Sequence, residues 1–302
     1  MKRHLFLLQG LLVAGTLYAA DANGPRLESP VLGYVFDSSA NQIRAISGIP
    51  GAAALGESVA LPVALTDAVV HSGSRAAVVL TKEGRMGLAW WSGAGRIVEL
   101  ETSLAALGGA AFSRSGKWLA IRDEAAVEVW SVAQSPALLG RWSVSVDAMD
   151  VSDAGTVLAV QGGSIVRLEG DQVQVVAGGG GWSALAYEAS GDAIAADTDR
   201  NELLRITPEG GRSVIAALPG RASVIAVASD GTLFAAAPAW GVMAIAGSTV
   251  TDAASCDCRP EGLDRLAGGA VHVRGTAWVV DSQEGLRLTA LPSLFALGAH
   301  QQ

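Results

Sequence analysis

The sequence offers few residues from which a metal centre could be built. It has two cysteines and four histidines among 302 residues, whereas a structural zinc site needs four ligands close together. His71, His272 and His300 are isolated in the sequence, and no Gly-x-Ser-x-Gly motif occurs. A hydrolase with a nucleophile elbow therefore has no support, and we expect no metal and no cofactor.

Charged residues are also scarce, at 17% of the chain, and lysine and arginine are scattered rather than clustered. The formal net charge is -8, and it becomes -9 if a leader containing Lys2, Arg3 and Asp21 is removed. An acidic chain without a basic stripe is repelled by phosphate backbones. We therefore expect no nucleic-acid partner.

No apolar run is long enough to cross a membrane. Lys2, Arg3 and His4 precede an apolar run from Leu5 to Leu17, which is the order of a secretory signal peptide. This run of about 13 residues falls short of the roughly 20 that span a bilayer. Ala20 and Ala22 satisfy the small-x-small rule for cleavage after Ala22, with cleavage after Ala20 as the second choice. We expect residues 1–22 to be a signal peptide, residues 23–302 to be one domain, and the product to be periplasmic or secreted without stable membrane insertion.

Glycine, in contrast, is abundant and recurs at a regular spacing. Six short turns between apolar runs carry the glycines Gly73, Gly116, Gly155, Gly191, Gly231 and Gly268, which are separated by 43, 39, 36, 40 and 37 residues. The flanking runs have four to seven residues and no 3.6-residue stripe, so they indicate buried strands. Glycine supplies the positive φ that a tight turn needs, so each motif predicts a hairpin.

Each of these units continues with a third apolar run and usually a fourth. Units of four short strands that repeat every 36 to 43 residues are typical of a β-propeller blade. The stretch from Pro30 to Pro62 supplies one more hairpin, so we expect an all-β propeller with seven blades of four antiparallel strands, with six or eight blades as alternatives. The first unit lacks an obvious innermost strand, and SLFALG (residues 293–298) is a candidate to complete it and close the ring.

Several segments resemble known repeats. FSRSGKWLAIRDEAAVEVWSV (residues 112–132) resembles a WD40 or TolB-type repeat, while YVFDSSANQIRAI, AIAADTDRNELLRIT and AWVVDSQEGLRLT resemble the second and third strands of NHL or YVTN repeats. The resemblance covers nearly all of the mature chain and implies a secreted bacterial propeller. The Gly-His and Trp-Asp pairs of WD40 repeats are missing, so no WD40 function is carried over.

Loops between second and third strands open on the face of a propeller that usually holds the ligand. The predicted loops begin with polar or turn residues, from which we select Asp37, Arg122, Asp197 and Asp281 as candidate ligand-binding residues, together with Trp240 in the loop APAWG. An aspartate at such a place also commonly accepts backbone N–H bonds in an Asx-turn, and this structural alternative applies to each of the three. DTDRNE, from Asp197, lacks the glycine and the bidentate glutamate of a calcium loop.

The two cysteines, Cys256 and Cys258, are two residues apart. In an oxidising compartment a local disulfide is expected, although residues two apart in an extended strand lie near the upper Cα limit, so pairing requires a turn. Inert thiols are the alternative.

The sequence favours a monomeric binding or scaffolding module for a protein or glycan partner. The rival hypothesis is an extracytoplasmic enzyme, a lyase, lactonase or glycan-active protein, with carboxylates such as Asp37, Asp197 and Asp281 at the channel mouth. A structural role without a discrete ligand is a third possibility.

Overall fold

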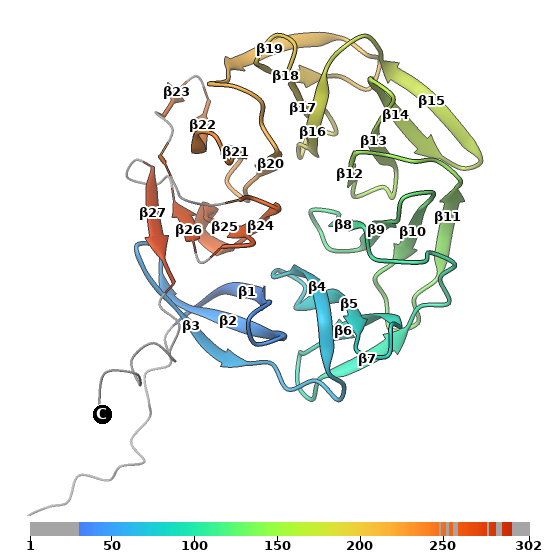
Figure 1. Cartoon of the computed structure of the whole chain (residues 1–302), viewed down its shortest axis with the longest axis vertical. Coiled ribbons are helices and arrows are strands. Elements are labelled where there is room, and N and C mark those ends of the chain that lie inside the picture. The colour runs from blue at the N-terminus through green and yellow to red at the C-terminus, as the bar shows by residue number, and fades with distance from the viewer. Residues whose placement is uncertain are drawn as a thin grey trace, which may run out of the picture.

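The computed structural model describes residues 30–291 except 248, 252–253, 256–258, 277 and 282–285. These residues form a ring of seven antiparallel sheets around a central channel (Figure 1). We call each sheet a blade and number the blades 1–7 in chain order. Six blades have four strands and blade 1 has three described strands. The expected seven-bladed β-propeller is confirmed. Cys256, Cys258 and SLFALG lie outside the described residues.

In blades 2–7 the strands follow one another from the channel to the rim in chain order. Blade 2 consists of β4 (Leu65–His71), β5 (Ala76–Thr81), β6 (Met86–Trp90) and β7 (Arg96–Glu99). Blade 3 consists of β8 (Gly109–Phe112), β9 (Trp118–Arg122), β10 (Val127–Ser131) and β11 (Leu138–Trp142). Blade 4 consists of β12 (Ala148–Val151), β13 (Val157–Gln161), β14 (Ser164–Glu169) and β15 (Gln172–Ala177).

Blades 5–7 repeat this plan, with one short 3-10 turn, η1 (Ala267–Gly269), in blade 7. Their strands are β16 (Trp182–Tyr187), β17 (Ala193–Asp197), β18 (Glu202–Ile206) and β19 (Arg212–Ala217); β20 (Val224–Val227), β21 (Leu233–Ala237), β22 (Gly241–Ala246) and β23 (Thr249–Val250); and β24 (Gly262–Arg265), β25 (Val271–Arg274), β26 (Trp278–Asp281) and β27 (Arg287–Ala290).

Blade 1 contains β1 (Val31–Asp37), β2 (Gln42–Ile49) and β3 (Ala52–Ser58), which occupy the second to fourth positions of a blade. β1 is set back from the channel in Figure 1, and β4 and β24 contact each other in front of it. The hairpin after β1 also matches the one after β17, because Asn41 and Asn201 both have a positive φ, of 53° and 52°. The described part of blade 1 therefore lacks an innermost strand, as the sequence predicts.

The hydrophobic core is divided into seven clusters, one at each interface between neighbouring blades. Second strands such as β17 and β21 are buried along their whole length, because both faces of each sheet pack against another sheet. This explains their continuous apolar runs. Leu32 and Val35 of blade 1 pack with Leu266 and Leu291 from the end of the chain, and this contact closes the ring.

The glycine-bearing turns join the first and second strands of blades 2–7, as predicted. We call the face of the ring that carries them face A, and the opposite face, with the loops between second and third strands, face B. Gly116, Gly155 and Gly231 adopt positive φ and donate their N–H to the carbonyl three residues earlier. In blade 2 this place belongs to Arg75, with φ 49°, and not to Gly73, so the predicted hairpin is confirmed but the positive φ expected at Gly73 is wrong.

Candidate functional site

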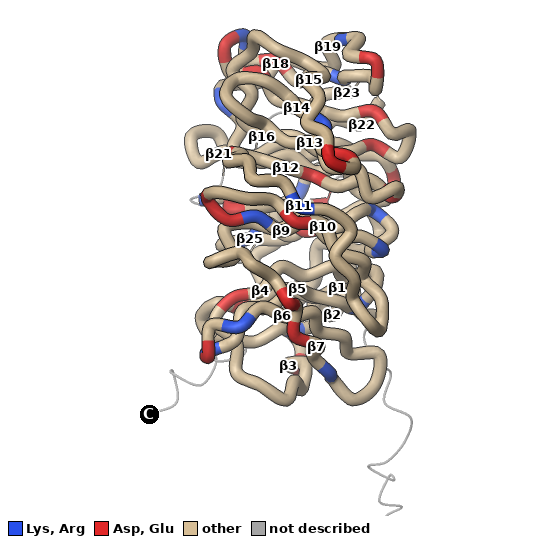
Figure 2. Tube along the Cα trace, turned by 90° about the vertical axis from the view of Figure 1, so that its right-hand side faces the viewer, with Lys and Arg blue, Asp and Glu red and all other residues tan. Residues whose placement is uncertain are grey.

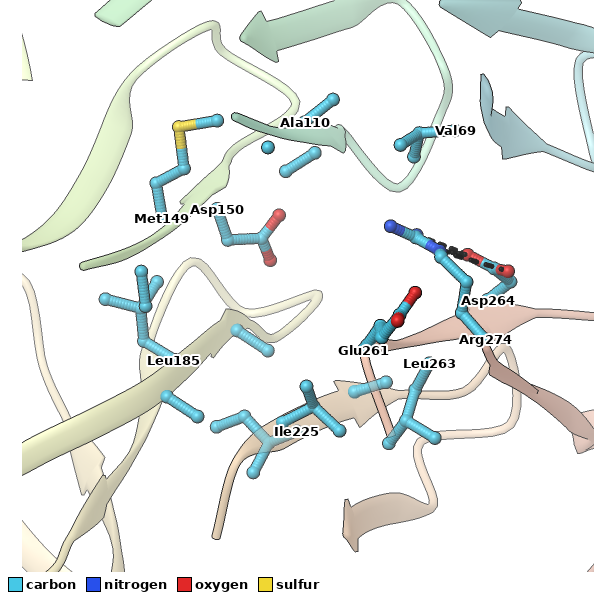
Figure 3. Close-up of a pocket in the computed structure, with 18 of the residues that line it drawn as sticks. Val69, Ala110, Met149, Asp150, Leu185, Ile225, Glu261, Leu263, Asp264 and Arg274 are labelled. Carbon is cyan, nitrogen blue, oxygen red and sulfur yellow. Dashed lines mark hydrogen bonds and ion pairs between the residues drawn. The ribbon is translucent and has the colours of Figure 1, made fainter. Parts of the chain in front are cut away.

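The channel contains a cavity of about 300 Å³ lined by the first strands of blades 2–7. One apolar side chain from each of these strands faces the others in a girdle, which Figure 3 shows: Val69, Ala110, Met149, Leu185, Ile225 and Leu263. First strands need polar partners at their inner edge, because no further strand pairs with their N–H groups there. Polar side chains of the channel can supply these backbone partners.

Asp150 of β12 serves such a backbone role. Its Oδ1 accepts the Val151 N–H at 2.9 Å, and its Oδ2 accepts the Tyr187 N–H of the next blade at 2.8 Å. Arg265 Nη2 lies 3.8 Å from Asp150 Oδ2. Burial raises the pKa of Asp150 and outweighs the opposing influence of Arg265 and of the two N–H bonds. The carboxyl joins the inner strands of blades 4 and 5.

Asp264 of β24 forms the other buried polar group of the channel. It lies opposite His272 of β25, whose Nδ1 is 3.3 Å from Asp264 Oδ2, and the Arg274 guanidinium pairs with Asp264 Oδ1 (Figure 3). Burial would raise the pKa of Asp264, but Arg274 and the hydrogen bond from His272 outweigh it and lower the pKa to about 2. Asp264 is thus ionised and paired, which suits a structural or orienting role better than proton transfer.

His71 connects two blades on face A. Its Nδ1 is 2.7 Å from Ser74 Oγ and its Nε2 is 3.3 Å from the Arg114 carbonyl oxygen, while its ring packs against Phe112. Burial lowers the pKa of His71, against the effect of the Arg114 carbonyl. A neutral imidazole therefore fixes the turns of blades 2 and 3 relative to each other.

Asp37 and Asp197 occupy matching positions on face B, and each is bonded within its own hairpin. Asp37 Oδ1 accepts the Ser39 N–H at 3.1 Å, and Asp197 Oδ1 accepts the Asp199 N–H at 3.0 Å. The second oxygens pair with Arg44 Nη1 at 3.2 Å and with Arg200 Nη1 at 2.8 Å, respectively.

Burial alone would raise the pKa of each carboxyl, but these partners lower it. Asp37 and Asp197 are therefore ionised acceptors that close their turns, and neither has the raised pKa of a general acid.

The other three candidates lie in different surroundings. Arg122 lines the channel and donates from Nη2 to the Asp147 carbonyl at 3.2 Å. Trp240 is half-buried in the core between blades 5 and 6, and no described residue accepts a hydrogen bond from its indole N–H. Asp281 ends a third strand, β26, so it lies on face A. The expectation that Asp281 opens a loop between second and third strands is wrong, and the five residues do not converge. Ligand binding by any of them stays a prediction.

Sequence patterns did not single out Asp150, Asp264 or Arg265. Asp150 is the one charged side chain of the innermost strand AMDV, and Asp264 and Arg265 are the two charged side chains of the innermost strand GLDR. A charge in such a short apolar strand is a usable signal, but it requires knowing which strands line the channel.

The described residues contain no group of three or more His, Cys, Asp and Glu side chains placed to hold a metal ion. They also include no helix that is both long and apolar enough to span a membrane.

No protein-family model and no curated protein matches the chain. Among solved structures, it is similar to a streptogramin B lyase, with 14% identity, a TM-score of 0.55, and 83% of this chain and 90% of that chain covered. A virginiamycin B lyase from Staphylococcus aureus shares 16% identity at a TM-score of 0.54, with 74% and 83% covered. The Cps50 (Swd1) β-propeller domain of Myceliophteria thermophila shares 13% identity at a TM-score of 0.57, with 76% and 87% covered. At such identities the likeness identifies the fold alone, a seven-bladed β-propeller.

Proposed function

We propose that the protein is an exported binding module that docks a protein partner on the outer rim of blades 3–6. The observation that carries the proposal is the exposure of apolar side chains on the outermost strands of these four consecutive blades. They are between 44% and 61% exposed and comprise Leu138 and Leu139, Val173 and Val175, Val214, and Val250. Large apolar side chains that are exposed on successive outermost strands favour an interaction surface along the rim.

The rim also offers unpaired strand edges. β15 pairs only with β14 and its sequence, QVQVVA, has no charged residue, whereas soluble proteins usually protect exposed edges with charges or proline. Figure 2 views the ring from the side of β11 and β15, where acidic and basic residues are interspersed and no single sign dominates. An extended segment of a partner can add to such an edge through backbone hydrogen bonds.

The catalytic alternative has less support. Two of the similar structures are lyases, but here Asp37 and Asp197 are bonded within their own turns and Asp264 is paired with Arg274. A carboxylate enzyme needs a general acid or base free to reach substrate.

Export is supported by the leader-like residues 1–22. The mass of the mature chain tests export, with Asn23 expected as its first residue.

Affinity capture from the envelope of the source bacterium tests the docking surface. The variant Leu139→Lys/Val175→Lys is compared with wild type and with Ser58→Lys/Ser92→Lys, which adds the same charge at exposed positions of blades 1 and 2. We expect one protein to be retained by wild type and the control and lost from the rim variant. Retention by all three chains, or release of the partner by glycosidases, would refute the proposal.

A further inference from the structure

We propose that the face A mouth of the channel binds an oxyanion, a carboxylate or phosphate group of a ligand, through Arg265, Arg114 and Arg75. This mouth is a different surface from the rim, and anion binding there does not depend on a partner docked at the rim.

The site is a second cavity, of about 350 Å³, next to the channel. Turns of blades 2, 3, 6 and 7 and the start of β1 line it, and its hydrogen-bonding groups include Ser72, Ser229 and the three arginines. No aspartate or glutamate is among the described residues that line it. Three cationic side chains around one cavity, in a chain with a net charge of -8, form a local field that attracts anions.

Arg265 occupies the centre of this region. It lines the channel, the second cavity and a third cavity on the same face, and its side chain is only 21% exposed. Among the described residues its one ion pair is with Asp150 at 3.8 Å, beyond hydrogen-bond distance, and the carboxylate oxygens of Asp150 already accept two backbone N–H groups. A guanidinium carries five N–H donors, so Arg265 has donors available for a ligand.

Arg114 is fixed at the opposite side of the mouth. One Nη2 donor reaches the Ser229 carbonyl at 2.6 Å, from blade 3 to blade 6, and its own carbonyl contacts His71. A carboxylate, Asp153, lies in the adjoining cavity, where its Oδ1 accepts the Ser115 N–H at 2.7 Å. Arg114 therefore presents its remaining donors from an anchored position.

Arg75 is the third cation and holds an unfavourable backbone conformation. Its φ of 49° occurs where Gly116, Gly155 and Gly231 stand in other blades, and such a φ is costly for a residue with a long side chain. Its side chain makes no ion pair with the described residues. The turn thus places a guanidinium that has no ion pair with the described residues at the mouth, at a position that glycine holds in other blades.

Guanidinium groups bind carboxylate and phosphate through paired N–H donors. β1 borders the cavity with its inward edge, and Ser72 Oγ accepts the Tyr34 N–H there at 2.9 Å. Ser72 Oγ in turn donates to the Tyr34 carbonyl at 3.0 Å, so this pair is satisfied and the three arginines supply the donors for an acceptor-only ligand group. Carboxylate and phosphate share this chemistry, so the experiment uses one probe of each kind.

Isothermal titration of the purified protein with inorganic phosphate and with succinate, at constant chloride, tests the site. We expect at least one of the two to bind, with affinity about tenfold weaker in Arg265→Gln and severalfold weaker in Arg114→Gln. Arg200→Gln removes an exposed arginine on face B and serves as the matched control, with unchanged affinity expected.

Arg75→Gly is a second test that does not rely on a destabilised fold, because glycine suits the positive φ of this turn. The variant should keep the fold and bind the anion probes more weakly. Circular dichroism and the unfolding midpoint are recorded for every variant. The preferred probe identifies the ligand group as carboxylate or phosphate. Absence of binding by both probes, or equal affinity in Arg265→Gln, Arg75→Gly and wild type, overturns the proposal.

Discussion

The two faces of the ring use the same kinds of charged residue in opposite ways. On face B, Asp37 and Asp197 each accept a backbone N–H of their own turn and form an ion pair, with Arg44 and Arg200 respectively. On face A, Arg75 has no ion pair with described residues and Arg265 has one long one. The face that sequence patterns favoured is thus the one whose charges are already satisfied.

The difference follows from the partners that each face supplies. A hairpin such as DTDRN contains its own acceptor, N–H donors and cation within five residues, so it completes its hydrogen bonds locally. Turns at the channel mouth meet turns from blades far away in the chain, as Arg114 and Ser229 do. Unpaired groups are therefore more readily found where distant turns converge, and the following changes test this contrast.

The largest change in the free energy of unfolding is expected at Asp264, a buried and ion-paired carboxylate next to Arg265 on β24. Asp264→Asn leaves the Arg274 guanidinium without its buried counter-ion, and we expect the free energy of unfolding to fall by about 3 kcal/mol. Denaturant unfolding at neutral pH measures it. Glu99→Gln removes one partner of an exposed pair with Arg85, whose side chains are 56% and 57% exposed, and should cost under about 0.5 kcal/mol.

The same comparison of unfolding free energies at lower pH tests whether ionised Asp264 causes the difference. The folded-state pKa of Asp264 is about 2, below its ordinary value of 3.8, so its ionised form stabilises the fold above about pH 4. This contribution is lost as the pH falls towards 2. The stability difference between wild type and Asp264→Asn should therefore shrink across that window, and a constant difference would contradict the ion-pair explanation.

An intermediate effect is expected on face B. Asp197→Asn weakens the contacts of the buried carboxylate with the Asp199 N–H and with Arg200, which should cost about 1 to 2 kcal/mol of unfolding free energy. Asp37→Asn, in the matching but more accessible turn, should cost less. Phosphate and succinate titrations should be unchanged in both variants. A weaker anion affinity in either would break the contrast between the faces.

A smaller effect of opposite sign is expected at Arg75. Replacing it with glycine relieves the positive φ of 49°, although the unfolded chain gains entropy. We expect a net gain of about 0.5 to 1 kcal/mol, measured as a higher unfolding midpoint, together with weaker anion binding. Asn201→Gly is the comparison, since Asn tolerates φ near 52° and should gain less. Lower stability in Arg75→Gly would mean that its side chain supports the fold.

Much of the fold was predictable because its determinants are local. Gly116, Gly155 and Gly231 marked turns that the structure places between first and second strands, and the short apolar runs marked strands buried on both faces. The hairpin at Asp37 was placed in the correct loop, whereas Asp281 was not. In blade 7 the segment WVVD forms a third strand, β26, although its apolar pattern resembles the second strands of other blades.

The candidate site was less predictable because it depends on contacts between blades. Asp150 meets Tyr187, 37 residues away, and Arg265 meets Asp150 across the channel. No sequence spacing encodes such pairs, because they arise only when the ring closes and brings the first strands of six blades around one axis.

The sequence by itself determined the propeller fold and favoured seven blades, since turn glycines and short apolar runs recur about every 40 residues, and the closed ring then gave the number as seven. The tertiary structure alone decided which charges are satisfied and which face the channel with free donors. The physical reason is that a turn satisfies its hydrogen bonds with near neighbours, whereas the partners of an inner-strand charge are supplied by whichever blades the closed ring places beside it.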